Sequence, residues 1–180
     1  MNISESGLPY QTDLYKNIVI QTIAKAKHLH RTLGNDLLKD KTFLNLINKL
    51  DQSIEATQKE MQSIGVISVC SECSIHGEGT CCGYRTGYKC DSILLFINLL
   101  LGRSISLQSK NPHRCFFLTD KGCSLRARPV ICVNFICSRL RNNLSHKQLV
   151  HLQEIAGVEI EMLFALEEYI KKYSSSSANL

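Results

Sequence analysis

The chain has 180 residues, of which 44% are hydrophobic and 21% charged, a composition typical of one globular domain over residues 1–180 with its own core. Residues 1–16 lack the basic start and apolar stretch of a secretory signal, and the longest apolar run, residues 93–101, is about half the length that a bilayer crossing needs. We therefore expect a cytoplasmic protein without a membrane segment, whose net charge of +5 is unevenly distributed along the chain.

Residues 1–65 are predicted to form a helical hairpin. Apolar residues recur at helical spacing from Asp13 to Leu33, and Gly34 and Asn35 are expected to end that helix. A second apolar stripe follows a seven-residue repeat, with Phe43, Ile47, Leu50, Ile54, Thr57, Met61 and Ile64. Two helices joined by a short turn predict an antiparallel pair. A dimer seam is the alternative use of the second stripe; packing within the chain is favoured, and the oligomeric state stays open.

Residues 66–143 hold all nine cysteines. The first part of this region is predicted to be loop, because glycine permits the positive φ angles needed to wrap a backbone around a metal. The glycines concerned are Gly65, Gly77, Gly79, Gly83 and Gly87. Further along, Asp91 is placed to cap a short, buried helix over residues 92–101, which Gly102 ends.

Residues 144–173 are predicted to form C-terminal helices. Ser145 and Gln148 make a capping box, and Gly157 is a candidate break in the apolar face that follows. Residues 174–180 are expected to be a flexible polar tail. The predicted fold class is therefore mainly α, with the hairpin and the C-terminal helices packed around a cysteine-rich, loop-rich metal-binding core.

Eight of the nine cysteines form two tetrads along the sequence: Cys70, Cys73, Cys81 and Cys82, then Cys115, Cys123, Cys132 and Cys137. An odd number of thiols in a cytoplasmic protein argues against a disulfide framework and favours metal binding. Cys70 and Cys73 have the spacing that places two sulfurs on a tight turn around one metal. Because Cys81 and Cys82 are adjacent, their side chains point in different directions and can serve two metals or two corners of one cluster.

The second tetrad resembles part of a known family. The residues that carry the resemblance are the run Cys115-Phe116-Phe117-Leu118, then Gly122-Cys123-Ser124-Leu125, Arg128-Pro129, Cys132, Phe135 and Cys137. They look like the second half of the CxxCxxCC, or YkgJ-like, cysteine-cluster family of zinc- or iron-chelating proteins, and the first tetrad fits the order of the first half. The resemblance covers residues 70–137. The chain departs from the family in the seven residues between Cys73 and Cys81, where two are usual, and in the additional Cys90.

The resemblance implies that the eight cysteines are metal ligands, either of an iron–sulfur cluster, with 4Fe–4S favoured, or of zinc. The spacing does not separate these metals. Two features favour iron–sulfur, because apolar neighbours limit solvent access and arginines offset the negative charge of a cluster. The apolar neighbours are Phe116, Phe117, Leu118, Ile131, Val133, Phe135 and Ile136, and the arginines are Arg114, Arg126, Arg128, Arg139 and Arg141. The family pattern places Arg128 beside the sulfurs. Cys90 is interpreted as a buried apolar residue and His76 as a loop residue, with a ligand role open for both.

The expected function is metal or cluster binding with an electron-transfer, sensing or accessory role, with a protein as a possible partner. The distant likeness to the cysteine cluster of flagellin lysine N-methylases leaves an iron–sulfur-dependent protein lysine methyltransferase open, although no familiar catalytic motif is present. A structural zinc module that binds a macromolecular partner is the other alternative. Residues 103–147 carry nine Lys or Arg against the single acid Asp120, locally 9 − 1 = +8, but no nucleic-acid-binding signature, so nucleic acid is not the expected partner.

Overall fold

The computed structural model describes residues 8–76, 81–109, 111, 113–119 and 122–177. The elements follow in the order α1 (Leu8–Leu37), α2 (Lys41–Ser63), α3 (Val66–His76), α4 (Tyr84–Gly87), α5 (Ser92–Leu100), β1 (Leu118–Thr119), β2 (Gly122–Cys123), α6 (Val130–Asn134), α7 (Ser138–Asn143) and α8 (His146–Ser177). Most of the described residues are helical, and the two short strands form one antiparallel pair. The predicted mainly α fold is therefore confirmed.

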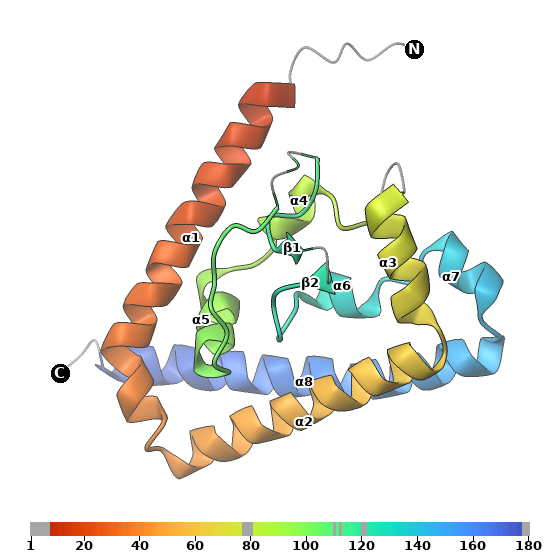
Figure 1. Cartoon of the computed structure of the whole chain (residues 1–180). Helices are drawn as coiled ribbons and strands as arrows, with labels where there is room; N and C mark the ends of the chain where they lie inside the picture. Colours follow the sequence, from red (N-terminus) through yellow and green to blue (C-terminus); the bar gives the residue numbers. More distant parts are fainter. Residues whose placement is uncertain (1–7, 77–80, 110, 112, 120–121, 178–180) are drawn as a thin grey trace.

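The long helices α2 and α8 lie side by side along one edge of the molecule (Figure 1). The apolar stripe predicted for α2 is confirmed, because its buried residues are Phe43, Ile47, Leu50, Ser53, Ile54, Thr57 and Met61. Asp40 begins the helix as its N-cap, since its carboxylate accepts a hydrogen bond of 2.9 Å from the backbone N–H of Phe43. The ring of Phe43 contacts that of Tyr169 on α8, at 6.2 Å between centroids. The stripe thus packs within the chain, as expected.

The predicted antiparallel hairpin is corrected, because α1 diverges from α2 and packs on α5 instead (Figure 1). Helical periodicity identifies an apolar face but not the element that covers it. The helix α1 also runs through the break expected at Gly34. A Cβ at Gly34 would lie 3.7 Å from Leu100 of α5, an ordinary contact distance, so this residue marks a helix–helix contact and not a helix end.

The C-terminal region is one continuous helix, α8. It begins as predicted, but two other expectations for this region are wrong. The capping box is confirmed: the side chain of Gln148 accepts from the N–H of Ser145 at 2.9 Å, and the Ser145 hydroxyl accepts from the N–H of Gln148 at 3.3 Å. Gly157 does not break the helix. The expected tail is helical as far as Ser177, and the Ser174 hydroxyl donates to the carbonyl of Lys171. Residues 178–180 lie outside the described part.

The short helix α5 forms as predicted. Asp91 accepts a hydrogen bond of 2.8 Å from the N–H of Leu94, and residues 94–98 are buried. This helix lies between α1 and the cysteine-rich segments, which pack against it (Figure 1). Within the described part of the chain, none of the helices has both the length and the apolar character that a membrane span requires.

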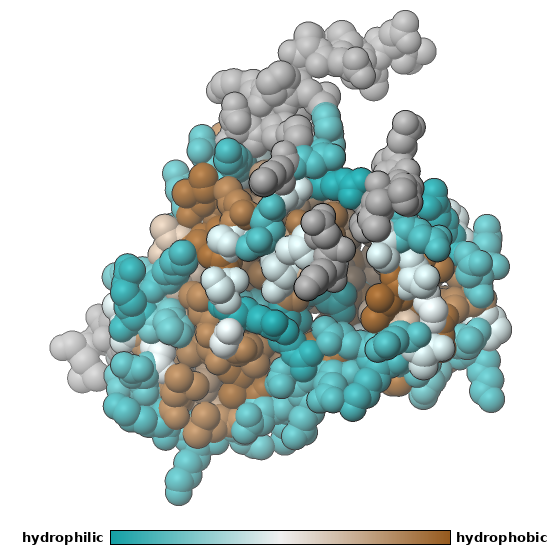
Figure 2. All heavy atoms as spheres, in the orientation of Figure 1, coloured by the Kyte–Doolittle hydropathy of each residue, from teal (hydrophilic) through white to brown (hydrophobic). Residues whose placement is uncertain are grey.

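Two hydrophobic clusters hold these elements together. The larger one joins α1, α2, α5 and α8 to the segment around β1, with Phe96 and Phe117 fully buried. The smaller one contains Met61, Val66 and Leu140, from α2, α3 and α7. On the face drawn in Figure 2, hydrophobic side chains reach the surface on the side of α1 and α5 and again near α3 and α7. The cysteine-rich segments lie between the two clusters and contact both.

Candidate metal centre

The first two cysteines lie on a helix and not on the predicted tight turn. Cys70 and Cys73 are three residues apart on α3, which places them on one helix face about one turn from each other. The loop expectation fails here because residues 66–76 contain no glycine or proline, so a helix restarts directly after Gly65, whose φ is +80°. His76 is the last residue of α3, and its side chain lies outside the described part, as do Gly77 and Gly79.

The adjacent residues Cys81 and Cys82 are held by different partners. The carbonyl of Cys82 accepts a hydrogen bond of 2.7 Å from the N–H of Cys115, which joins the two tetrads directly. The carbonyl of Cys81 accepts a bond of the same length from the hydroxyl of Thr86 on α4. The backbone therefore fixes one cysteine of the pair against α4 and the other against the segment that precedes β1.

Gly87, at the end of α4, allows this segment to approach the second tetrad closely. A Cβ at this position would lie only 2.8 Å from the Phe116 ring and 3.6 Å from the sulfur of Cys115. Gly87 does not have the predicted positive φ. Among the described glycines, those with positive φ are Gly65, Gly102 and Gly122. Close packing explains its presence instead.

Cys115 and Cys123 flank a small hairpin. The N–H of Leu118 donates to the carbonyl of Cys115 at 3.0 Å, and Leu118 is paired with Cys123 across the two strands. The N–H of Ser124 then donates to the carbonyl of Phe117 at 2.9 Å. The hairpin therefore brings the first two cysteines of the second tetrad back toward each other.

Cys132 and Cys137 lie on the two short helices that follow. Pro129 is the N-cap of α6, and its carbonyl accepts from the N–H of Cys132 at 2.7 Å. Cys137 is the N-cap of α7 and packs against the smaller hydrophobic cluster, which includes Val66 of α3. The helices α7 and α3 are neighbours (Figure 1), so Cys137 lies on the side of the first tetrad.

All nine cysteines are free thiols. Partial removal from water and the thiols of Cys81, Cys137 and Cys73 together raise the pKa of Cys70 to about 11, because neighbouring thiolates repel one another. The surroundings of Cys70 therefore include two other members of its own tetrad and one member of the other.

The remaining thiols of the second tetrad form another neighbourhood. Burial raises the pKa of Cys115 to about 11, with a contribution from Cys123, and the pKa of Cys132 to about 12, with contributions from Cys123, Cys115 and Cys81. Burial also raises the pKa of Cys90, and the thiols of Cys115, Cys132 and Cys123 add to that rise. Although Cys123 is an exposed residue, the chain around its sulfur removes it partly from water and raises its pKa as well.

The thiols of Cys81 and Cys82 shift each other's pKa. The neighbouring thiol of Cys82 lowers the pKa of Cys81, and that of Cys81 raises the pKa of Cys82. Burial and the thiols of Cys132 and Cys115 add to the rise in the pKa of Cys82. The two groups of thiols therefore meet at this dipeptide.

Arg128 stands beside both groups. Its charge lowers the pKa of Cys70, Cys123 and Cys132, against the larger rise that burial causes. One end of its guanidinium donates to the sulfur of Met61 at 3.9 Å, and its buried Nε has no hydrogen-bond partner. A buried N–H without a partner beside thiols is a donor suited to a sulfur ligand or an anionic cluster, as expected for this arginine.

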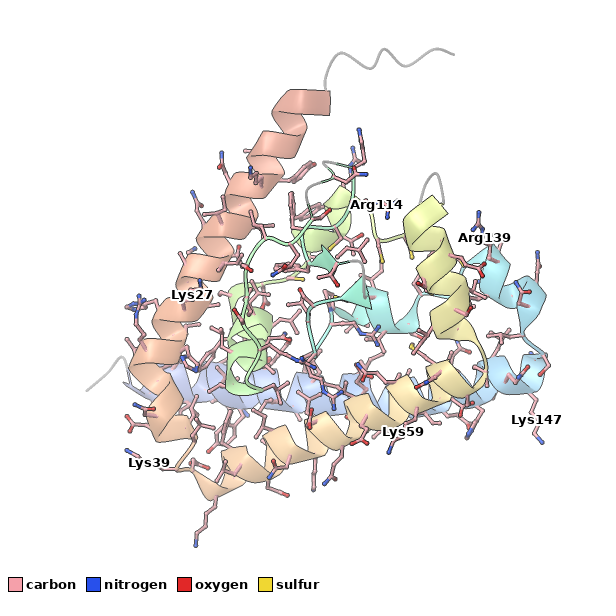
Figure 3. All side chains as sticks on the ribbon, viewed as in Figure 1. Lys27, Lys39, Lys59, Arg114, Arg139 and Lys147 are labelled. Atoms are coloured by element: carbon pink, nitrogen blue, oxygen red, sulfur yellow. The ribbon has the colours of Figure 1, made fainter. Side chains whose placement is uncertain are left out.

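Arg126 is used differently, which corrects the expectation that it offsets thiolate charge. Its Nε donates to Asp51 at 2.7 Å and its Nη1 to Gln58 at 2.8 Å, so it fastens the cysteine-rich region to α2. Arg139 (Figure 3) and Arg141 are exposed on α7. Among Arg126, Arg128, Arg139 and Arg141, it is therefore Arg128 whose charge lowers the pKa of thiols.

The apolar surround of the second tetrad is confirmed in part. Residues 116–118 and Val133 are buried, whereas Ile131 and Phe135 are 54% and 50% exposed. Val133 and Ile131 lie on the core face and the solvent face of the short helix α6, residues 130–134, and Phe135 is the extended residue that follows it. The apolar shield therefore covers one side of the second tetrad.

Asn98 is a positioning residue that the cysteine pattern did not reveal. It is fully buried on α5, its Nδ2 donates to the carbonyl of Ala127 at 2.9 Å, and its Oδ1 accepts from the N–H groups of Arg126 at 2.7 Å and Ala127 at 3.1 Å. The segment that leads to Arg128 is therefore tied to α5. The signal in the sequence was a single polar residue in an apolar run, because buried polar side chains are almost always hydrogen-bonded.

Within the described residues, no three Cys, His, Asp or Glu side chains are arranged to hold a metal ion. The free thiols are nevertheless the donors that zinc and iron–sulfur centres use, so the donor set fits such a centre, and the sulfurs would have to draw closer to bind it. No protein-family model, curated protein or solved structure matches this chain. The resemblance to the YkgJ-like family therefore rests on the cysteine pattern alone.

Proposed function

We propose that this chain binds iron–sulfur of the 4Fe–4S type, with four thiolates to each cluster drawn from Cys70, Cys73, Cys81, Cys82, Cys115, Cys123, Cys132 and Cys137. The observation that supports this most strongly is the gathering of free thiols from distant segments beside the unpartnered Nε of Arg128. When bound, such a centre supplies electron-transfer or sensing chemistry, for the chain itself or as an accessory to a protein partner.

The crowding of the thiols is the first argument for a metal. Burial and neighbouring thiols raise the pKa of Cys70 to about 11 and that of Cys132 to about 12. These thiols are therefore protonated at neutral pH, and their closeness adds little stability to the fold. A bound metal reverses this balance, because its positive charge deprotonates the thiols that coordinate it. The charge of Arg128 acts in the same direction, since it favours the thiolate form of these residues.

Two further observations favour iron–sulfur over zinc. The buried residues 116–118 shield the second tetrad from water on one side, which is a means by which proteins set the potential of a cluster. The Nε of Arg128 is a donor without a partner, and hydrogen bonds to cluster or ligand sulfur have the same effect. A closed zinc site of four cysteines is the alternative that uses the same ligands.

Anaerobic purification followed by visible absorption and analysis of iron, acid-labile sulfide and zinc tests the proposal. We expect a brown protein that contains iron and sulfide. A colourless protein that contains zinc would overturn the iron–sulfur assignment. A protein that holds neither metal, even after anaerobic reconstitution with iron and sulfide, would overturn metal binding altogether.

Cys123→Ser and Ser124→Ala form a matched pair of variants, because the two residues are neighbours at the end of the hairpin. We expect Cys123→Ser to lose about half of the bound metal or more, since one four-thiolate site loses a ligand. Ser124→Ala should keep all of it, and far-UV circular dichroism of both variants should match the wild type. Unchanged metal content in Cys123→Ser would remove Cys123 from the ligand set.

A further inference from the structure

The folded chain groups the cysteines differently from their order in the sequence. We propose that the ligands form two adjoining four-thiolate centres, in which Cys81 joins Cys70, Cys73 and Cys137, and Cys82 joins Cys115, Cys123 and Cys132. Relative to the two tetrads of the sequence, Cys82 and Cys137 change places. This inference rests on the proposed metal binding and adds the division of the ligands.

Cys82 belongs with the second tetrad because the backbone connects it to Cys115. The N–H of Cys115 donates to the carbonyl of Cys82 at 2.7 Å, and both residues pack in the larger hydrophobic cluster. The hairpin returns Cys123 to the same place through its pairing with Leu118.

Cys137 belongs with the first tetrad because α7 packs beside α3. Cys137 and Val69 both contact the smaller hydrophobic cluster, and Val69 immediately precedes Cys70 on α3. The helix α3 also carries Cys73, one turn further along. Cys81 completes this group, because its neighbour Cys82 is held by Cys115.

The dipeptide of Cys81 and Cys82 is where the two centres meet. Its carbonyls are bonded to different segments, that of Cys81 to Thr86 and that of Cys82 to Cys115, so the chain changes partner between the two residues. When both residues bind metal as thiolates, the two centres lie on either side of one peptide bond.

Cys90 is left outside both centres. It is 4% exposed in the larger hydrophobic cluster, behind the second group of thiols. Cys82 completes that group because its backbone is hydrogen-bonded to Cys115. Cys90 therefore remains a buried thiol that packs as a small apolar residue.

Two double variants distinguish the two divisions of the ligands. If the ligands are exchanged as proposed, Cys81→Ser and Cys137→Ser damage the same centre, so their combination should keep about half of the wild-type metal. Cys81→Ser combined with Cys82→Ser should lose nearly all of it, because each substitution removes a ligand from a different centre. If the centres followed the sequence, these two results would be interchanged.

The outcomes separate this inference from the proposed function. Interchanged results, or metal for only one centre in the wild type, would overturn the division while metal binding stands. Absence of metal from the wild type would overturn the proposed function itself. Cys90→Ala should keep all of the metal, and loss of half there with full retention in Cys82→Ser would overturn the place given to Cys82.

One measurement does not depend on whether the variants fold. Electron paramagnetic resonance of the reduced wild type should show spin–spin coupling between two clusters, because the centres adjoin at a single dipeptide. Two uncoupled signals would overturn the adjoining arrangement. Far-UV circular dichroism of each variant separates loss of metal from loss of helix.

Discussion

Asn98 is the buried side chain that joins α5 to the segment leading to Arg128, and Asn98→Leu tests whether this joint stabilises the fold. Leucine nearly fills the same space, but it leaves the N–H and the carbonyl of Ala127 without their partners, and Ala127 is only 1% exposed. Each buried backbone group left unsatisfied costs about 1–3 kcal/mol, so the two groups together predict a loss of about 2–6 kcal/mol in the free energy of unfolding. The N–H of Arg126 is only half-buried and is left out of this sum because water can reach it.

Urea denaturation followed by far-UV circular dichroism measures this loss, provided that the transition is two-state. Asn48→Leu is the matched control, because Asn48 is exposed on α2, and it should change the free energy of unfolding by about 0.5 kcal/mol or less. If Asn98→Leu also changed the free energy of unfolding by only about 0.5 kcal/mol or less, the hydrogen bonds of Asn98 would not hold the segment, and the reasoning would be refuted.

Two other predictions concern the packing and the charge of buried positions. Gly87→Ala should lower the free energy of unfolding by about 1–3 kcal/mol, because the added Cβ would lie 2.8 Å from the buried ring of Phe116. Gly157 has open space around it, so Gly157→Ala should raise the free energy of unfolding by about 0.5–1 kcal/mol. Urea denaturation that gave both changes the same sign would contradict this. Glu159→Gln should stabilise the fold at neutral pH, because burial raises the pKa of Glu159 and its charged form is therefore unfavourable. That gain should shrink as the pH falls through the raised pKa and vanish below the ordinary value of 4.5, so a gain in urea denaturation that is independent of pH would show that the charge is not its cause.

Local signals in the sequence were sufficient for the elements whose ends depend on one or two side chains. Asp91 was predicted to cap α5, and its carboxylate does accept from the N–H of Leu94. The capping box of Ser145 and Gln148 begins α8 as predicted. These predictions succeed because capping involves atoms only two or three residues apart, so the surrounding fold has little influence on them.

The partners of the helices could not be predicted in the same way. The stripe on α2 identifies a buried face, but whether α1 or α8 covers that face depends on the whole chain, and α8 covers it. The helix α3 was missed because the glycines on both sides of it were taken to extend the loop across residues 66–76. Those residues lack any helix-breaking side chain, and Gly65 alone is enough to separate α3 from α2.

The candidate ligands could be named from the sequence because a thiol carries its chemistry in its residue type. Their proposed division could not, because it is inferred from the hydrogen bond between Cys82 and Cys115 and from the packing of Cys137 near α3. Neither contact leaves a mark on the spacing of the cysteines. Arg126 illustrates the same limit, since its position among cysteines suggested charge compensation, while Asp51 on another helix determines what it binds.

The segment of residues 126–128 is held in place beside the candidate ligands by two helices. Arg126 ties it to α2 through Asp51, and Asn98 ties it to α5, so the segment is held from two sides by side chains that are not themselves ligands. Cys123 precedes this segment and Cys132 follows it, while Arg128 within it stands beside both groups of thiols. The candidate ligands Cys123 and Cys132 therefore lie on either side of a segment that α2 and α5 hold in place, which is how residues that are not ligands can orient those that are.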